Sequence, residues 1–96
     1  MGEDYDAARA LALHGLATGL HGDRDAAEAR LRRAMGEFEH GGSRHWQART
    51  WEMLGQVAQA DGDRAEAERR YRHSLSLYTP LSGRDADRLE GRLAKL

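Results

Sequence analysis

Five histidines are the residues of this sequence that could bind a metal ion or transfer protons. His14 and His21 are seven residues apart, which on a helix is about two turns, whereas zinc-binding helices place histidines three or four residues apart. His40 and His45 flank a Gly-Gly-Ser segment and could approach each other. The sequence has no cysteine, which excludes disulfides, thiolate zinc sites and cysteine nucleophiles. We therefore expect hydrogen-bonded or solvated histidines, with no metal and no cofactor.

Other motifs for catalysis or phosphate binding are also missing from the sequence. It contains no glycine-rich phosphate loop, no serine elbow and no setting for paired carboxylates. Arg69, Arg70 and Arg72 could contact a phosphate, but Glu66 and Glu68 lie beside them, so we expect intrahelical salt bridges on a solvated face. Basic and acidic residues number 15 and 16, a balance that argues against nucleic acid or membranes as partners. These absences favour a non-catalytic protein, and the charge balance leaves another protein as the expected partner.

The composition indicates which elements must position these side chains. Val57 is the only valine, Phe38 is the only phenylalanine and there is no isoleucine, so little is available to build a β-sheet. The 96 residues predict one small all-α domain. No run of about 18 apolar residues is present, and the start of the chain is acidic where a signal peptide would be basic, so we expect a cytoplasmic protein. The strong preference for arginine over lysine suggests GC-rich coding and an actinobacterial source.

The chain repeats itself with a period of 40 residues. Residues 22–32 aligned with residues 62–72 give seven identical pairs out of eleven. The repeat continues upstream, where Arg9 and Gly15 align with Arg49 and Gly55. The sequence thus predicts two copies of one unit, repeat 1 over about 4–42 and repeat 2 over about 43–80.

Each unit is expected to form a helix hairpin with a Gly-Asp turn. The glycine can adopt the left-handed conformation that ends one helix, and the aspartate can cap the next. Gly22-Asp23 and Gly62-Asp63 predict helices over about 4–20, 23–39, 43–60 and 63–78, and Pro80 prevents the last of them from continuing. Leucines at helical spacing predict a capping helix over about 85–96.

The second unit resembles the tetratricopeptide repeat. The resemblance covers about residues 8–80 and is clearest at Trp51, Leu54, Gly55, Gly62-Asp63, Ala67, Tyr71, Ser74 and Leu75; the first unit matches more weakly at Leu11, Gly15, Ala27, Leu31, Ala34 and Met35. Gly55 and Ala67 are small enough to let two helices approach closely, while larger residues fill the remaining space. His14 departs from the pattern because it places a polar ring where repeat 2 has Leu54.

The repeat length is the second departure from the pattern. A period of 40 exceeds the roughly 34 residues of the standard repeat and falls where HEAT and armadillo repeats also lie, but the Gly-Asp turns and the small residues favour the tetratricopeptide interpretation. The longer variety is similar to arrays in bacterial transcription regulators and signalling ATPases. The resemblance implies a fragment of a right-handed α-solenoid, with two hairpins and a capping helix.

The resemblance also implies a concave groove that binds a peptide or helix. Leu13, Leu16 and Met53 would anchor apolar side chains, and four polar residues would orient the partner. A clamp for a C-terminal carboxylate is not expected, because the corresponding positions of the first unit are apolar and the chain has no asparagine. The predicted groove residues are Arg9, Ala12, Leu13, Leu16, Leu20, Arg49, Glu52, Met53, Gln56, Gln59, Arg92 and Leu93, of which Arg49, Glu52, Gln56 and Arg92 are the orienting set.

An alternative is that these apolar residues belong to the core, as helical spacing normally indicates. Leu11, Leu13, Leu16 and Leu20 nevertheless lie on more than one face of the first helix, and one hairpin partner covers only one face. Further repeats or a second copy of the chain would then cover the rest, which predicts a homodimer through residues about 5–20. The alternative function is a structural or dimerisation segment with no ligand of its own.

Overall fold

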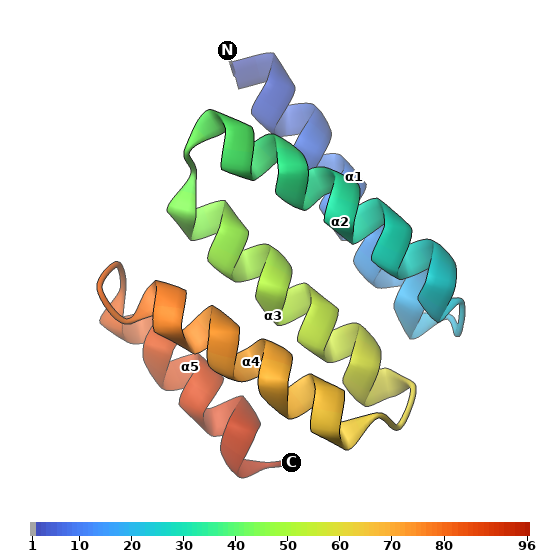
Figure 1. The fold of residues 1–96 in the computed structure, drawn as a ribbon, viewed down its shortest axis with the longest axis vertical. Helices are drawn as coiled ribbons and strands as arrows, with labels where there is room; N and C mark the ends of the chain where they lie inside the picture. Colours follow the sequence, from blue (N-terminus) through green and yellow to red (C-terminus); the bar gives the residue numbers. More distant parts are fainter. Residues whose placement is uncertain (1) are drawn as a thin grey trace.

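Five helices make up the computed structural model, which describes residues 2–96, with side chains from Asp6 onward. None of these residues forms a strand, so the predicted all-α class is confirmed. Met1 and the side chains of residues 2–5, where the predicted self-association segment begins, lie outside the described residues. The helices are α1 (Gly2–Leu20), α2 (Arg24–Gly41), α3 (Arg44–Ala60), α4 (Arg64–Tyr78) and α5 (Gly83–Ala94) (Figure 1).

The two predicted Gly-Asp turns form as expected. Gly22 and Gly62 have φ angles of 105° and 79°, in the left-handed region that favours glycine. Asp23 and Asp63 then accept hydrogen bonds from the backbone N–H groups of Ala26 and Glu66, at 3.1 and 3.2 Å. These aspartates satisfy amides that the first turn of a helix leaves free. The same residue pair therefore ends α1 and α3 and starts α2 and α4.

Close approach within each pair of helices depends on glycine. A Cβ atom placed on Gly55 of α3 would lie 2.5 Å from the Tyr71 ring of α4. At the equivalent position of α1, a Cβ on Gly15 would lie 3.1 Å from Leu31 Cγ of α2. Ala67, also predicted to be small for this reason, is fully buried. The prediction that small residues let two helices approach closely is thus confirmed for α3 and α4, and the same holds for α1 and α2.

The helices pack in chain order into two layers. α1 packs against α2 and α3 against α4, while α3 also contacts α1 and α2, and α5 covers α4. Figure 1 shows α2 and α4 on the near side, with α1 and α5 behind them. The Cα atoms extend over 37 × 32 × 15 Å, a thickness that accommodates two helix layers. Helices that are far apart in the sequence, α1, α3 and α5, can therefore contribute to one surface.

Arginines connect the two helix pairs. Arg24, after the first turn, contacts Asp61 and Asp63 of the second turn at 2.9 and 3.0 Å. Arg70 of α4 donates to Glu28 of α2 at 2.9 Å. It also donates to the Leu54 carbonyl oxygen at 3.0 Å and is 4% exposed. The expected intrahelical salt bridges form, from Arg69 and Arg70 to Glu66 and from Arg72 to Glu68. The expectation that Arg70 lies on a solvated face is wrong, because its guanidinium joins the two pairs.

His14 lies on the surface, as expected of a solvated histidine, although it aligns with a packing position of repeat 2. Its side chain is exposed, whereas Leu54 at the equivalent position of repeat 2 is buried. The reason is that Leu54 packs in a core cluster with residues of α1 and α2, while the described helices leave the equivalent face of α1 exposed. The exposed His14 ring therefore does not disturb the packing of the core.

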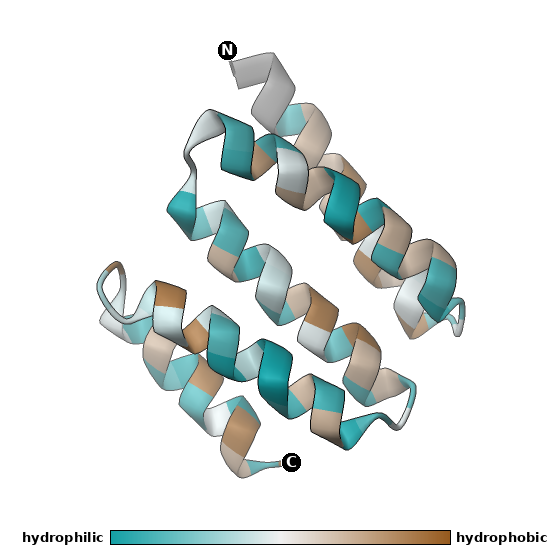
Figure 2. Ribbon diagram, viewed as in Figure 1, coloured by the Kyte–Doolittle hydropathy of each residue, from teal (hydrophilic) through white to brown (hydrophobic). Residues whose placement is uncertain are grey.

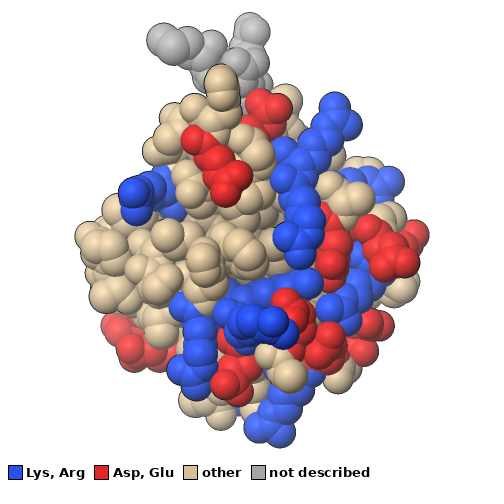
Figure 3. Space-filling model, viewed as in Figure 1, with Lys and Arg blue, Asp and Glu red and all other residues tan. Residues whose placement is uncertain are grey.

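The surface agrees with the balanced composition. α1 is the least hydrophilic of the five helices (Figure 2). On the face shown in Figure 3, basic and acidic side chains are intermixed. Across the described part of the chain, no helix is long and apolar enough to span a lipid bilayer.

Candidate partner-binding groove

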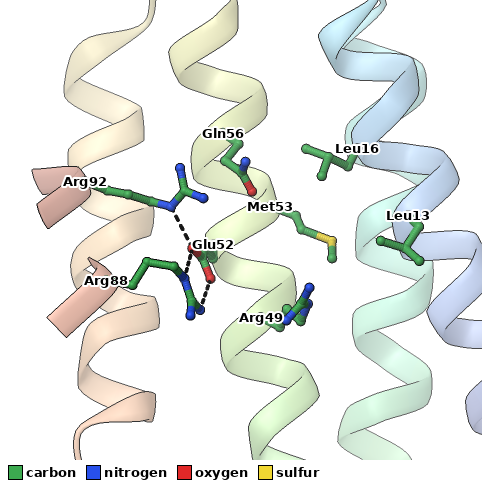
Figure 4. A pocket seen from close by; sticks show the side chains of 8 residues that line it. All are labelled: Leu13, Leu16, Arg49, Glu52, Met53, Gln56, Arg88 and Arg92. Carbon is green, nitrogen blue, oxygen red and sulfur yellow. Dashed lines mark hydrogen bonds and ion pairs between the residues drawn. The ribbon is translucent and has the colours of Figure 1, made fainter. Parts of the chain in front are cut away.

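Residues from α1, α3 and α5 line a pocket of about 310 Å³ (Figure 4). The central helix α3 forms the floor, α1 forms one wall and α5 forms the other. Seven of the eight lining residues belong to the set predicted from the sequence; the exception is Arg88. The lining residues are Leu13, Leu16, Arg49, Glu52, Met53, Gln56, Arg88 and Arg92.

Glu52 organises the wall on the α5 side. Its carboxylate accepts hydrogen bonds from Arg88 at 2.8 and 3.0 Å and from Arg92 at 2.7 Å. Burial raises the pKa of the Glu52 carboxyl, but the two arginines more than offset this effect, so the pKa lies below its usual value. Burial and the nearby Glu52 carboxylate raise the pKa of Tyr78, whose hydroxyl lies 3.5 Å from Glu52 Oε1, to about 12. Glu52 is thus a fixed anion that holds α5 against α3.

The wall on the α1 side is apolar. Leu13 is 50% exposed and Leu16 is half-buried, and Figure 4 shows both pointing toward Met53 across the pocket. Met53 is only 3% exposed and belongs to the core cluster. Its predicted role as a free anchor therefore needs correction, because its side chain is already packed and only lines the floor. Leu13 offers the accessible apolar surface.

Arg49 lies at the end of the pocket near Leu13 and makes no ion pair or hydrogen bond with any residue that the structure describes. Its Nε atom is buried and lacks a hydrogen-bond partner among the same residues. The guanidinium lies over the Trp46 ring, 5.4 Å from the centroid. Arg9, at the equivalent position of repeat 1, contacts the same ring at 5.0 Å. Two arginines thus meet at Trp46, beside the apolar half of the groove.

Five predicted residues do not line this pocket. Ala12 is fully buried in the core, so it cannot contact a partner, and Leu20 is exposed near the end of α1. Gln59 accepts a hydrogen bond from Tyr71 at 2.7 Å and lines an adjoining hollow beside Arg92. Arg9 is at Trp46, and Leu93 packs against the core cluster that contains Tyr71, Tyr78 and Leu89. Glu52, predicted to orient a partner, is instead occupied by Arg88 and Arg92.

Arg88 is the lining residue that the sequence reasoning missed. It lies four residues before Arg92 and therefore on the same face of a helix, which is a signal the sequence contains. The tail contains other arginines as well. Which of them can line the groove depends on which face of α5 packs on α4, and the buried side chains of Leu89 and Ala86 define that face.

Chemically, the pocket combines an apolar wall with three guanidinium groups and one carboxylate. Among the described residues, no group of three histidine, aspartate or glutamate side chains is placed to hold a metal ion. Comparison with known proteins identifies no relative, since no protein-family model, curated protein or solved structure matches the chain.

Proposed function

We propose that this chain is a protein-interaction module that binds a peptide or helix of a partner in the groove between α1 and α5. The observation that carries the proposal is a half-exposed leucine, Leu13, in one pocket with Arg49, which has no ion-pair partner among the described residues. A volume of about 310 Å³ is at the lower end of the range for small-molecule sites, so it suits one or two partner side chains. An exposed helical groove is a common means of recognising a peptide or helix.

The tetratricopeptide resemblance supports the same proposal. The helices pair in chain order, and the first helix of each pair contributes to the groove, as a solenoid of two hairpins and a cap would require. On this resemblance we place the protein in a bacterial regulatory or signalling system, in the cytoplasm.

The chemistry of the pocket favours binding over catalysis. Among the described residues that line it, Glu52 is the only carboxylate, and two guanidiniums hold that group ionised with a lowered pKa. A general acid or base needs a pKa near the working pH. Glu52 does not meet this requirement.

Two exposed leucines give a matched test of the groove. Leu13 is 50% exposed inside it, and Leu81 is 46% exposed in the segment between α4 and α5, outside it. Peptides selected from a random library against the wild-type chain should bind Leu13→Glu at least about tenfold more weakly, because the change removes the apolar contact and places a carboxylate beside Arg49. Leu81→Glu should bind them like the wild type. Equal binding by all three proteins, or no selected peptide, would refute the proposal.

A specific observation favours the second candidate function, self-association through α1. Thr50, Met53, Leu54 and Val57 of α3 are all buried, and the equivalent residues of repeat 1 (Ala10, Leu13, His14 and Ala17) are all exposed. In α3 these positions form the face that stacks on the first helix pair. In α1 the equivalent face is exposed among the described residues, and it carries no permanent charge. A second copy of the chain could cover it.

Sedimentation of the wild type and of Leu20→Glu tests this second candidate. Leu20 is 57% exposed and does not line the groove, so its replacement separates the two functions. Self-association predicts a dimer at high micromolar concentration that Leu20→Glu dissociates. A wild-type monomer at that concentration would exclude it.

A further inference from the structure

The charges that line the groove do not balance. Arg49, Arg88 and Arg92 face a single carboxylate, that of Glu52. Glu52 accepts hydrogen bonds from both Arg88 and Arg92, so these two guanidiniums already have their counterion. Arg88 also contacts Asp85. The uncompensated positive charge of the groove is therefore located at Arg49.

Arg49 is held in a state that is ready to bind an anion. Its buried Nε has no hydrogen-bond partner among the described residues, and leaving a buried donor unsatisfied is unfavourable. Stacking on the Trp46 ring fixes the plane of the guanidinium without using the donors at its edge. An arginine fixed in this way loses little conformational entropy when it binds a carboxylate in bidentate fashion.

The neighbours of Arg49 restrict what else the ligand must contain. Leu13 and Met53 line the same pocket, and Figure 4 shows Arg49 on the side of α3 that faces α1, where Leu13 lies. A ligand that reaches Arg49 therefore also covers exposed leucine surface. On the α5 side Glu52 already supplies the anion, so a second carboxylate there would meet a like charge.

From these contacts we infer that the groove selects a partner segment in which an aspartate or glutamate side chain, bound by Arg49, lies next to a large apolar side chain that covers Leu13. This inference rests on the proposed function and adds the chemistry of the partner. The anion is a side-chain carboxylate within the segment. Charge complementarity with Arg49 and the apolar wall beside it are the two features that the segment must match.

A peptide selection tests the inference against a matched control. The library displays random 12-residue peptides fused at their C-termini, so that only side chains supply carboxylates. Wild-type protein, Arg49→Met and Arg32→Met are used as baits. Methionine keeps a long apolar stem on Trp46, and Arg32 is an exposed arginine of α2 that does not line the groove. Thermal unfolding followed by circular dichroism verifies that each variant folds.

The wild type and Arg32→Met should enrich peptides with an acidic residue beside a large apolar one. Arg49→Met should enrich apolar residues without the acidic bias. For one amidated wild-type peptide, replacing its glutamate by glutamine should weaken binding about tenfold to the wild type and leave binding to Arg49→Met nearly unchanged.

The possible failures are distinct. If the wild type enriches no peptide, or if its peptides bind Leu13→Glu as well as they bind the wild type, the proposed function itself fails. If groove-dependent peptides show no acidic bias, or lose equal affinity for both proteins when glutamate becomes glutamine, only the inference about Arg49 is overturned.

Discussion

At the residue scale, the groove shows two arginine environments that the sequence does not distinguish. Arg92 and Arg49 were both predicted to orient a partner, but Arg92 is bound to Glu52, whereas Arg49 has no carboxylate partner in the part of the chain that the structure describes. The repeat pattern correctly placed both side chains on the groove. The pattern could not show that Arg88 and Arg92 already occupy the Glu52 carboxylate, because that depends on how α5 packs. Position in a repeat predicts where a side chain points, and tertiary contacts determine whether it is available.

Glu52 gives a prediction of its own at this scale. Its side chain is 5% exposed and its two arginine partners are about one third exposed, so Glu52→Gln should lower the free energy of unfolding by about 2 to 3 kcal/mol at pH 7. Urea unfolding measures this loss. Glu37→Gln, an exposed position of α2, is the control and should change stability by less than about 0.5 kcal/mol.

The same residue contributes to the loss of stability in acid. The pKa of Glu52 is lower in the folded chain than its unfolded value of about 4.3, so the folded chain binds fewer protons. The contribution of Glu52 is therefore complete above about pH 4.3 and is lost as the pH falls through the folded pKa. Between pH 7 and pH 3, Glu52→Gln should lose less stability than the wild type. An equal loss would show that the ion pairs with Arg88 and Arg92 do not stabilise the fold.

At the element scale, the helix boundaries were predictable because local chemistry determines them. The Gly-Asp turns, Pro80 and the Gly41-Gly42 pair stop or start helices through the backbone alone, and the observed ends agree with the predictions to within about two residues. Burial was less predictable. Met53 and Leu13 occupy equivalent repeat positions, but only Met53 has a neighbouring helix pair to cover it. The sequence periodicity alone could not show which of these two equivalent residues is exposed.

Glycine substitutions test the packing of the elements. Gly55→Ala should lower the free energy of unfolding by about 1 to 3 kcal/mol, because its Cβ would lie 2.5 Å from the fully buried Tyr71 ring. Gly36→Ala should instead raise the free energy of unfolding by about 0.5 to 1 kcal/mol, since nothing beyond its chain neighbours and the surrounding backbone of α2 lies within 4 Å of the added Cβ, and alanine favours a helix. Thermal or urea unfolding compares the two. A stabilising Gly55→Ala would contradict the close contact between α3 and α4.

At the scale of the whole molecule, α5 covers one end of the stack, and none of the described residues covers the stacking face of α1 at the other. Leu89 of α5 is fully buried, whereas Leu13 and Leu20 of α1 are at least half exposed. The sequence indicated this asymmetry through leucines on several faces of α1. The same exposed surface serves both candidate functions, since Leu13 lies at once in the groove and on the uncovered face. Binding of a partner and self-association would compete at this residue.

The most direct measurement of the central proposal is the affinity of one selected peptide for Leu13→Glu and for Leu81→Glu under identical conditions. Both changes place a carboxylate at a leucine of nearly equal exposure, so their effects on solubility and net charge match. The groove predicts a Kd at least about tenfold higher for Leu13→Glu than for Leu81→Glu, with the latter equal to the wild type. Indistinguishable Kd values for the two variants would show that the surface between α1 and α5 is not the binding site.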